Sequence, residues 1–224
     1  MKKHLTYCVT CHGKYKRTQE NINVHRTFAL SLENFEVSFE EINTEDYKNW
    51  GGMSGLLSMY LDTNPNLPED GYLFSCEDDF MIKDVQALDN AINVLEEKSK
   101  TMNLAYVGHG SNSLNEHGYK TCADHTATFG DHCKWTDGGL YLFKNKKLLE
   151  IKNRLGVLPG HTKNNNDVPL PMDTELDFTN VTNRIFEHEV GFPTRLSYYG
   201  YDIWGIPNSQ IIKNLNEEKV IKNE

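Results

Sequence analysis

The sequence predicts an α/β fold in which helices flank a mostly parallel central sheet. Short apolar runs typical of buried strands recur along the chain, and segments with a helical spacing of apolar residues lie between them. Strands that alternate with helices favour parallel pairing, because each helix returns the chain to the end of the sheet where the next strand begins. The length of 224 residues, 38% of them hydrophobic, allows one large domain, or one domain with a small appendage, with a substantial core.

Five short segments have the pattern of strands. Leu5–Cys11, Tyr72–Phe74 and Leu104–Val107 are apolar, β-like runs that suit buried strands. Phe35–Phe39 alternates apolar and polar residues, which is the period of a half-buried strand. Gly139–Phe143 returns to the strand pattern late in the chain. We expect these segments to form the sheet.

Helices are predicted from apolar residues spaced three and four apart. Asp84–Lys98 has the clearest pattern and ends in a charged cluster. The other predicted helices are Thr18–Leu30, Leu56–Leu61, Lys147–Leu155, Glu175–Phe186 and a terminal helix in the polar tail beyond Pro207. Residues 108–137 show little periodicity, and a long irregular segment of this kind indicates a binding loop or lid.

Charge and hydropathy exclude two classes of partner. The net charge of −9 argues against nucleic acid, because binding to a phosphate backbone needs a basic face. No apolar run approaches the ~20 residues that span a bilayer. The start Met-Lys-Lys-His-Leu is not followed by the apolar segment of a signal peptide. We therefore expect a soluble, cytoplasmic protein without a membrane span.

The cysteines leave zinc binding, redox chemistry and simple burial open. Cys8 and Cys11 have the spacing of a redox or zinc pair, but they lie within a predicted strand and no second Cys-x-x-Cys completes a four-ligand site. Cys122 and Cys133 bracket two histidines and an aspartate that suit zinc. The alternative is free, buried thiols in a reducing compartment.

An acidic triplet at the end of a predicted strand is the most informative motif. In Gly71-Tyr-Leu-Phe-Ser-Cys-Glu-Asp-Asp-Phe80, an apolar run ends in Glu77, Asp78 and Asp79. Three adjacent carboxylates repel one another unless a cation neutralises them, and Mg²⁺ and Mn²⁺ prefer oxygen ligands. Ligands of open α/β sheets bind beyond the carboxyl ends of the strands, so the triplet predicts a metal-bridged phosphate site. The alternative is a solvated turn before a helix that begins near Asp84.

The order of the motifs resembles that of the GT-A-fold, nucleotide-sugar-dependent glycosyltransferases. Gly52-x-x-Gly55-x-x-Ser58 precedes the acidic triplet, and Gly138-Gly139-Leu-Tyr-Leu-Phe143 and Met172-Asp173-Thr-Glu-Leu176 follow it. The series is most similar to glycosyltransferase family 25 (lipopolysaccharide-type) and to small virus-encoded glycosyltransferase domains. The resemblance implies a single Rossmann-like GT-A domain, with a nucleotide-binding part over residues 1–107, an acceptor part over 108–207 and a C-terminal tail over 208–224.

The resemblance also implies metal ligands and a general base. Asp79, and Glu77 through a water, would hold Mn²⁺ or Mg²⁺ against the donor diphosphate, since a divalent cation stabilises the charge that develops on the leaving group. His188 would be a further metal ligand, or else a surface histidine between two glutamates. Asp173 would take the proton of the acceptor hydroxyl in an inverting transfer. In a retaining transfer it would bind a hydroxyl, and its structural alternative is a helix N-cap.

Residues that bind the donor are expected near the ends of the strands. Lys14 and Arg17 follow the first strand, where the nucleotide phosphates lie in this fold, and the alternative is a solvated basic turn. Thr10 and His12, at the end of that strand, are expected near the base or ribose. Asp78 is expected to approach hydroxyls of the ribose or the sugar.

Two glycines and two tryptophans complete the set of candidates. Gly138 and Gly139 are expected to let the backbone approach the donor sugar or the acceptor closely. Trp135 and Trp204 are candidates for stacking on a sugar ring.

These expectations together predict a metal-dependent glycosyltransferase. It would transfer a hexose or deoxyhexose from a nucleoside diphosphate, with UDP as the expected nucleotide, to a glycan or glycoprotein, in the host-cell cytoplasm if the protein is virus-encoded. A catalytically silent carbohydrate- or nucleotide-binding domain is the alternative from another class. A sugar-phosphate nucleotidyltransferase would share the sheet and the metal site. That class has a glycine-rich loop after its first strand, where this chain has only Gly13.

Overall fold

The computed structural model describes residues 2–11, 13, 15–43, 52–109, 132–133, 139–155, 158, 196, 199–213 and 215. The strands within this part of the chain are β1 (Lys3–Cys11), β2 (Phe35–Asn43), β3 (Tyr72–Glu77), β4 (Phe80–Ile82), β5 (Leu104–His109), β6 (His132–Cys133), β7 (Leu140–Lys144), β8 (Asp202–Ile206) and β9 (Ile211–Lys213). The α-helices are α1 (Lys16–Leu30), α2 (Gly52–Thr63), α3 (Val85–Lys98) and α4 (Asn145–Leu155).

The described strands form one large sheet and one small one. The large sheet has the order β2-β1-β3-β7-β5-β8-β6, and β4 pairs with β9 in a separate two-stranded sheet. β1 is parallel to β2 and β3, and β5 is parallel to β8. β7 runs antiparallel between β3 and β5, and β6 runs antiparallel to β8. The predicted α/β fold with a mostly parallel central sheet is therefore confirmed.

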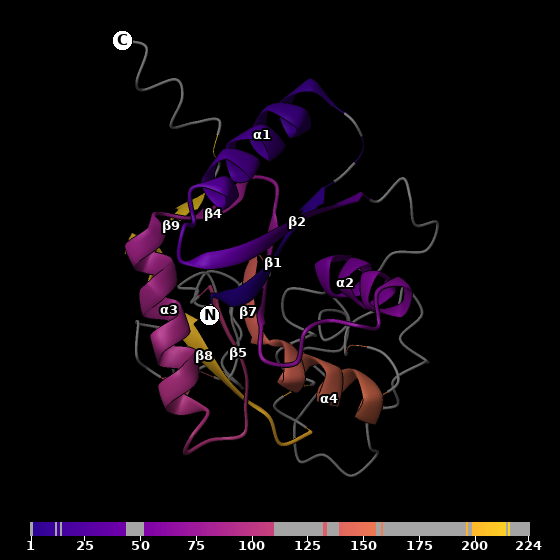
Figure 1. The fold of residues 1–224 in the computed structure, drawn as a ribbon, viewed down its shortest axis with the longest axis vertical. Helices are drawn as coiled ribbons and strands as arrows, with labels where there is room; N and C mark the ends of the chain where they lie inside the picture. Colours follow the sequence, from indigo (N-terminus) through magenta and orange to yellow (C-terminus); the bar gives the residue numbers. More distant parts are fainter. Residues whose placement is uncertain are drawn as a thin grey trace, which may run out of the picture.

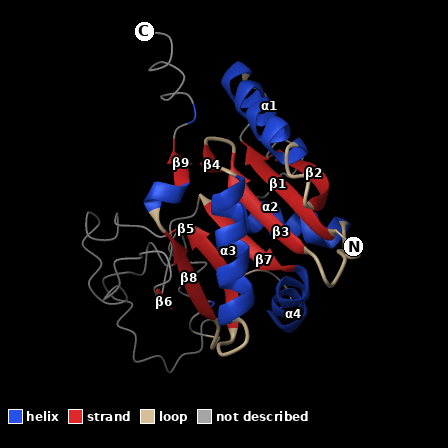
Figure 2. Cartoon of the chain, turned by 60° about the vertical axis from the view of Figure 1, so that its left-hand side comes forward, coloured by secondary structure: helices blue, strands red, loops and turns tan. Residues whose placement is uncertain are grey.

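Helices cover both faces of the large sheet (Figures 1 and 2). On one face, α1 and α3 pack over a cluster that contains Tyr7 of β1 and Phe74 of β3. On the other face, α2 and α4 pack over a second cluster. It contains Cys8 and Leu73, which are adjacent in sequence to Tyr7 and Phe74. Successive side chains of a strand point to opposite faces, so an apolar run such as that of β1 supplies both cores.

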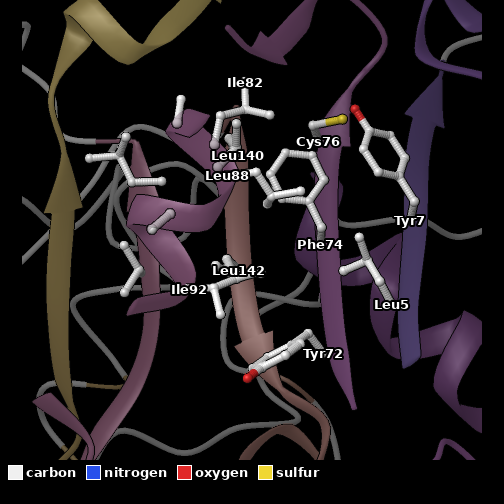
Figure 3. Packing of buried hydrophobic residues seen from close by; sticks show 14 of the residues in the cluster. Leu5, Tyr7, Tyr72, Phe74, Cys76, Ile82, Leu88, Ile92, Leu140 and Leu142 are labelled. Carbon is white, nitrogen blue, oxygen red and sulfur yellow. The ribbon is translucent and has the colours of Figure 1, made fainter. Parts of the chain in front are cut away.

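The side chains of β3 show this alternation in detail. Figure 3 shows Tyr72, Phe74 and Cys76 spaced along one face of β3, with Leu5 and Tyr7 of β1 beside them. All five are buried. Cys76 is the last fully buried residue of β3, and Glu77 after it is half-buried. The core therefore ends where the acidic triplet begins.

Several elements differ from the expectation. β4 and β8 were not predicted, and α1 begins at Lys16, so that Arg17 lies in its first turn rather than in a loop. The predicted terminal helix is wrong for residues 208–213. These residues form a short 3-10 helix and β9, because the isoleucines of β9 pair with β4. The predicted helix Glu175–Phe186 lies outside the described residues.

Within the described part of the chain, three cysteines are buried and form no disulfide, as one of the alternatives predicted: Cys8, Cys11 and Cys76. Cys8 and Cys11 belong to the clusters on opposite faces of the sheet, so they do not form a metal-binding or redox pair. Cys122 and the side chain of Cys133 lie outside the description. Among the described residues, no helix is long and apolar enough to cross a membrane.

Candidate functional site

The acidic turn, Glu77–Asp79, lies between β3 and β4 at the carboxyl end of β3. Glu77 is the last residue of β3, and all three acidic residues are half-buried. β1 runs parallel to β3 and brings Thr10 next to Glu77 in the pairing register. The carboxyl ends of two parallel strands thus meet at this edge of the sheet, where α/β proteins bind ligands.

Helix α1 holds the middle residue of the acidic turn at two points. The side-chain amide of Asn21 donates to a carboxylate oxygen of Asp78 at 3.2 Å. His25 Nε2 lies 3.1 Å from the carbonyl oxygen of Asp78. Because a carbonyl oxygen only accepts, His25 Nε2 carries a proton and donates it here.

This tautomer of His25 fixes the hydrogen bond on the other side of the ring. Nδ1 has no proton in the neutral ring, so it accepts the hydroxyl proton of Tyr7 at 2.9 Å. The thiol of Cys76 lies 3.8 Å from the same nitrogen. Figure 3 shows the Tyr7 hydroxyl and the Cys76 sulfur side by side at the upper end of β1 and β3. Burial lowers the pKa of His25 from 6.5 to about 4, so the ring is neutral at pH 7.

The C-terminal part of the described chain holds the turn from its other side. The N–H of Leu215 donates to the carbonyl of Asp79 at 3.2 Å. β9 pairs with β4, the strand that follows the turn. The acidic turn is therefore held by contacts from α1, from Leu215 and from the large sheet, which are far apart in the sequence.

Negative charge accumulates at Asp79. Burial raises the pKa of this carboxyl above its ordinary value of 3.8, and the charges of Glu77 and Asp78 raise it further, while the charge of Arg17 lowers it. Burial disfavours the charged carboxylate, and a cation bound here would relieve the part of the shift that comes from the charges of Glu77 and Asp78.

The N-terminus of α1 brings positive charge to the same edge. Arg17 is exposed in its first turn, next to Lys16, and no acidic residue lies in that turn. Tyr15, at the N-cap, makes no side-chain hydrogen bond to the helix. The N–H groups at the start of a helix and the helix dipole make such a terminus suitable for a phosphate, and the two basic side chains add positive charge.

The carboxylates of Glu77 and Asp79 suit a metal ion whose remaining ligands come from a bound phosphate and from water. No group of three His, Cys, Asp or Glu side chains that would hold a metal was found within the described ranges. Mg²⁺ in nucleotide enzymes is usually bound by one or two carboxylates together with phosphate oxygens and waters. Glu77 and Asp79 meet that smaller requirement, and the neighbouring negative charges of Glu77 and Asp78 disfavour an unneutralised Asp79 carboxylate.

The other described candidates have contacts within the protein. The hydroxyl of Thr10 donates to the carbonyl of Cys76 at 3.1 Å, and Thr10 is buried. The backbone of Gly139 accepts the N–H of Glu77 at 3.1 Å, and the ring of Phe80 fills the space that a Cβ at position 139 would need. The close approach at Gly139 is thus made to Phe80, and its predicted contact with a sugar stays a prediction.

Several predicted site residues lie outside the described residues: His12, Lys14, Gly138, Asp173 and His188, and also Trp135. Trp204 is 6% exposed and belongs to the core cluster beneath α3, with Lys98 Nζ 4.6 Å from the centre of its ring. Its predicted role as a stacking surface for a sugar is therefore wrong.

Sequence reasoning missed Asn21 and His25. With Arg17 they are spaced four residues apart, which places all three on one face of α1. This polar stripe is visible in the sequence. Its partner, the acidic turn more than 50 residues later, is not.

Comparison with known proteins finds similar solved structures but no similar sequence family. No protein-family model and no curated protein matches the sequence, so membership of family 25 stays a prediction. The chain is similar to the mannosyltransferase PcManGT from Pyrobaculum calidifontis, solved with GDP-Man and Mn²⁺, at 12% identity and a TM-score of 0.47. This match covers 97% of this chain and 58% of the mannosyltransferase.

A second similar structure is that of the galactosyltransferase LgtC with donor and acceptor sugar analogs, at 11% identity and a TM-score of 0.37. This match covers 73% of this chain and 68% of the LgtC chain. Both similar structures are of glycosyltransferases.

Proposed function

We propose that this chain is a metal-dependent glycosyltransferase that uses a nucleoside-diphosphate sugar, with a UDP-sugar as the first donor to test. The acceptor in this proposal is a hydroxyl of a glycan or glycoprotein. One observation supports it most. The carboxylates of Glu77 and Asp79 and the basic first turn of α1 lie at the carboxyl edge of a parallel pair of strands. That combination suits a pyrophosphate bridged by a divalent cation.

Each charged group has a distinct task in the proposed reaction. Glu77 and Asp79 bind Mn²⁺ or Mg²⁺, which supplies positive charge against the departing diphosphate. Arg17 and the N–H groups at the start of α1 bind phosphate oxygens that the cation does not cover. Groups that are in place before the reaction begins stabilise the developing charge without rearrangement, and this is the role that we propose for them.

The acceptor side of the proposal rests on Asp173. In an inverting transfer, the acceptor oxygen bonds to the anomeric carbon as the bond from that carbon to the diphosphate breaks. The Asp173 carboxylate takes the hydroxyl proton. In a retaining transfer Asp173 binds a sugar hydroxyl instead. His188 is a further metal ligand in this proposal.

Release of the nucleotide tests the proposal. The protein is incubated with Mn²⁺ and a panel of UDP- and GDP-sugars, and free nucleoside diphosphate is measured with and without glycan acceptors. We expect release with at least one donor and a loss of about 100-fold or more in Asp79→Asn. Asp89→Asn, on α3 and remote from the acidic turn, is the matched control and is expected to retain activity.

Other outcomes separate the rival functions. Binding of nucleotide sugars without release of nucleotide from any donor would favour a catalytically silent binding domain. Release of pyrophosphate from a nucleoside triphosphate and a sugar phosphate would favour a nucleotidyltransferase. Absence of both binding and release would contradict the proposal.

A further inference from the structure

One face of α1 connects the basic end of the helix to the acidic turn. Arg17, Asn21 and His25 follow one another at intervals of four residues, about 6 Å of helix rise each. The charge of Arg17 acts on Asp79, and Asn21 and His25 both contact Asp78. A rigid two-turn segment thus spans from the predicted phosphate-binding residue to the main chain of the predicted metal-binding turn.

The two contacts to Asp78 fix different parts of it. Asn21 holds the carboxylate, and His25 holds the peptide carbonyl. The two donors, Asn21 and His25, are both 0% exposed, and Asp78, which accepts from them, is half-buried. With its carboxylate and carbonyl both held, Asp78 also fixes the main chain on either side, which carries Glu77 and Asp79.

Such a restraint would oppose the electrostatic repulsion within the acidic turn. Carboxylates of three adjacent residues repel one another, and without a restraint the turn would relax by moving them apart. A hydrogen-bonded support would keep the two ligands at a fixed separation before any cation arrives. Supporting residues of this kind commonly contribute 10–100-fold to metal affinity.

We propose that His25 is a positioning residue for the metal site, acting through the carbonyl of Asp78, with Asn21 as its second support. The inference rests on the proposed metal–diphosphate function of Glu77 and Asp79. His25 itself contacts neither metal nor substrate. The carbonyl of Asp78 requires the neutral Nε2–H tautomer of His25, and Nδ1 of the same ring accepts the hydroxyl proton of Tyr7.

Three substitutions in the same cluster separate positioning from stability. His25→Asn keeps an acceptor near the position of Nδ1 but is too short to reach the carbonyl of Asp78. His25→Gln is one bond longer and places an amide N–H near the position of Nε2. Tyr7→Phe removes the hydrogen bond at Nδ1 and leaves His25 facing Asp78, so it disturbs the buried cluster without removing the support.

The measurement is the affinity for Mn²⁺ in the presence of UDP, by calorimetric titration, with the melting temperature of each apo variant recorded. We expect His25→Asn to weaken Mn²⁺ binding by about tenfold or more. His25→Gln is expected to restore most of the loss, and Tyr7→Phe to bind Mn²⁺ within about twofold of the parent even where its melting temperature falls. Asn21→Ala serves as a second test should His25→Asn fail to fold, and it is expected to weaken Mn²⁺ binding as well.

Two results would overturn the inference alone. In one, the parent binds Mn²⁺ with UDP and both His25→Asn and Asn21→Ala bind equally well. In the other, Mn²⁺ affinity follows the melting temperature through the whole series, Tyr7→Phe included. If the parent itself binds neither Mn²⁺ nor UDP, the proposed function fails and the inference fails with it.

Discussion

Gly139 and Phe80 approach each other so closely that a Cβ at position 139 would lie 2.4 Å from the Phe80 ring. Gly139 precedes β7 and Phe80 begins β4, and both adjoin the acidic turn. The N–H of Glu77 donates to the carbonyl of Gly139. The acidic turn is therefore supported by close packing as well as by the polar contacts from α1.

This packing predicts that Gly139→Ala is destabilising. The methyl group cannot be accommodated without displacing the Phe80 ring or the backbone, and overpacking of this kind costs ~1–3 kcal/mol. Denaturant unfolding would measure the loss. Phe80→Leu in the same chain should recover part of it. An unchanged unfolding midpoint in Gly139→Ala would show that the turn is looser than described.

Arg17 and Arg26 make a matched pair on one helix. Arg17→Ala should weaken UDP binding by about tenfold, or ~1.4 kcal/mol, because a charge-assisted contact to phosphate is lost. Arg26 lies over the ring of Phe39, so Arg26→Ala should leave UDP affinity unchanged. Titration of both variants with UDP and Mn²⁺ gives the comparison. Equal effects would mean that general positive charge, and not the start of α1, attracts the nucleotide.

Asp79→Asn should have opposite effects with and without metal. Without metal, the substitution removes one of three clustered negative charges, so the melting temperature should rise by about 2–4 °C. With Mn²⁺ and UDP, the ligand-induced rise in melting temperature that we expect for the parent should be absent from the variant. A variant that is less stable than the parent without metal would indicate that the Asp79 carboxylate has a structural role instead.

The opposite end of β3 carries a polar network that sets a pH dependence. The Tyr72 hydroxyl donates to the Glu96 carboxylate at 2.6 Å, and Lys144 Nζ donates to the same carboxylate at 2.9 Å. Lys3 Nζ donates to the Tyr72 hydroxyl at 2.6 Å. Burial alone would raise the pKa of Glu96, but the hydrogen bonds from Tyr72 and Lys144 and the charges of Lys144 and Lys3 outweigh it and lower the pKa from 4.5 to about 2.

A carboxyl whose pKa is lower in the folded than in the unfolded state stabilises the folded state at any pH above its unfolded-state pKa. This stabilisation is lost as the pH falls through the folded-state pKa. The melting temperature of Glu96→Gln should therefore be below that of the parent at pH 7, and the gap should narrow between about pH 4.5 and 2. The neighbouring Glu97→Gln, with only a 3.9 Å exposed contact to Lys98, is the control. A gap that stays constant over this range would contradict the assignment.

The sequence predicted the regular part of this fold because burial and periodicity are local properties. The apolar runs of β1 and β3 and the helical spacing of α3 are each readable within a dozen residues. β4 and β9 are three residues long and form only by pairing with each other across more than 120 residues, so no local pattern revealed them. The direction of β7 is likewise set by its neighbours and not by its own composition.

The residues of the candidate site likewise fall into those that the sequence revealed and those that only the fold reveals. Glu77, Asp78 and Asp79 stood out because three carboxylates after an apolar run have no role in packing. His25 and Asn21 read as ordinary polar residues of an amphipathic helix. Their function depends on the acidic turn, which the fold alone brings next to α1.

The location of a bound metal tests the central claim most directly. Crystals grown with Mn²⁺ and UDP would be examined by anomalous scattering at the manganese absorption edge. The account predicts one strong peak between the carboxylates of Glu77 and Asp79, with the diphosphate extending from it toward Arg17. A manganese peak elsewhere on the protein, or a diphosphate bound away from the acidic turn, would contradict it.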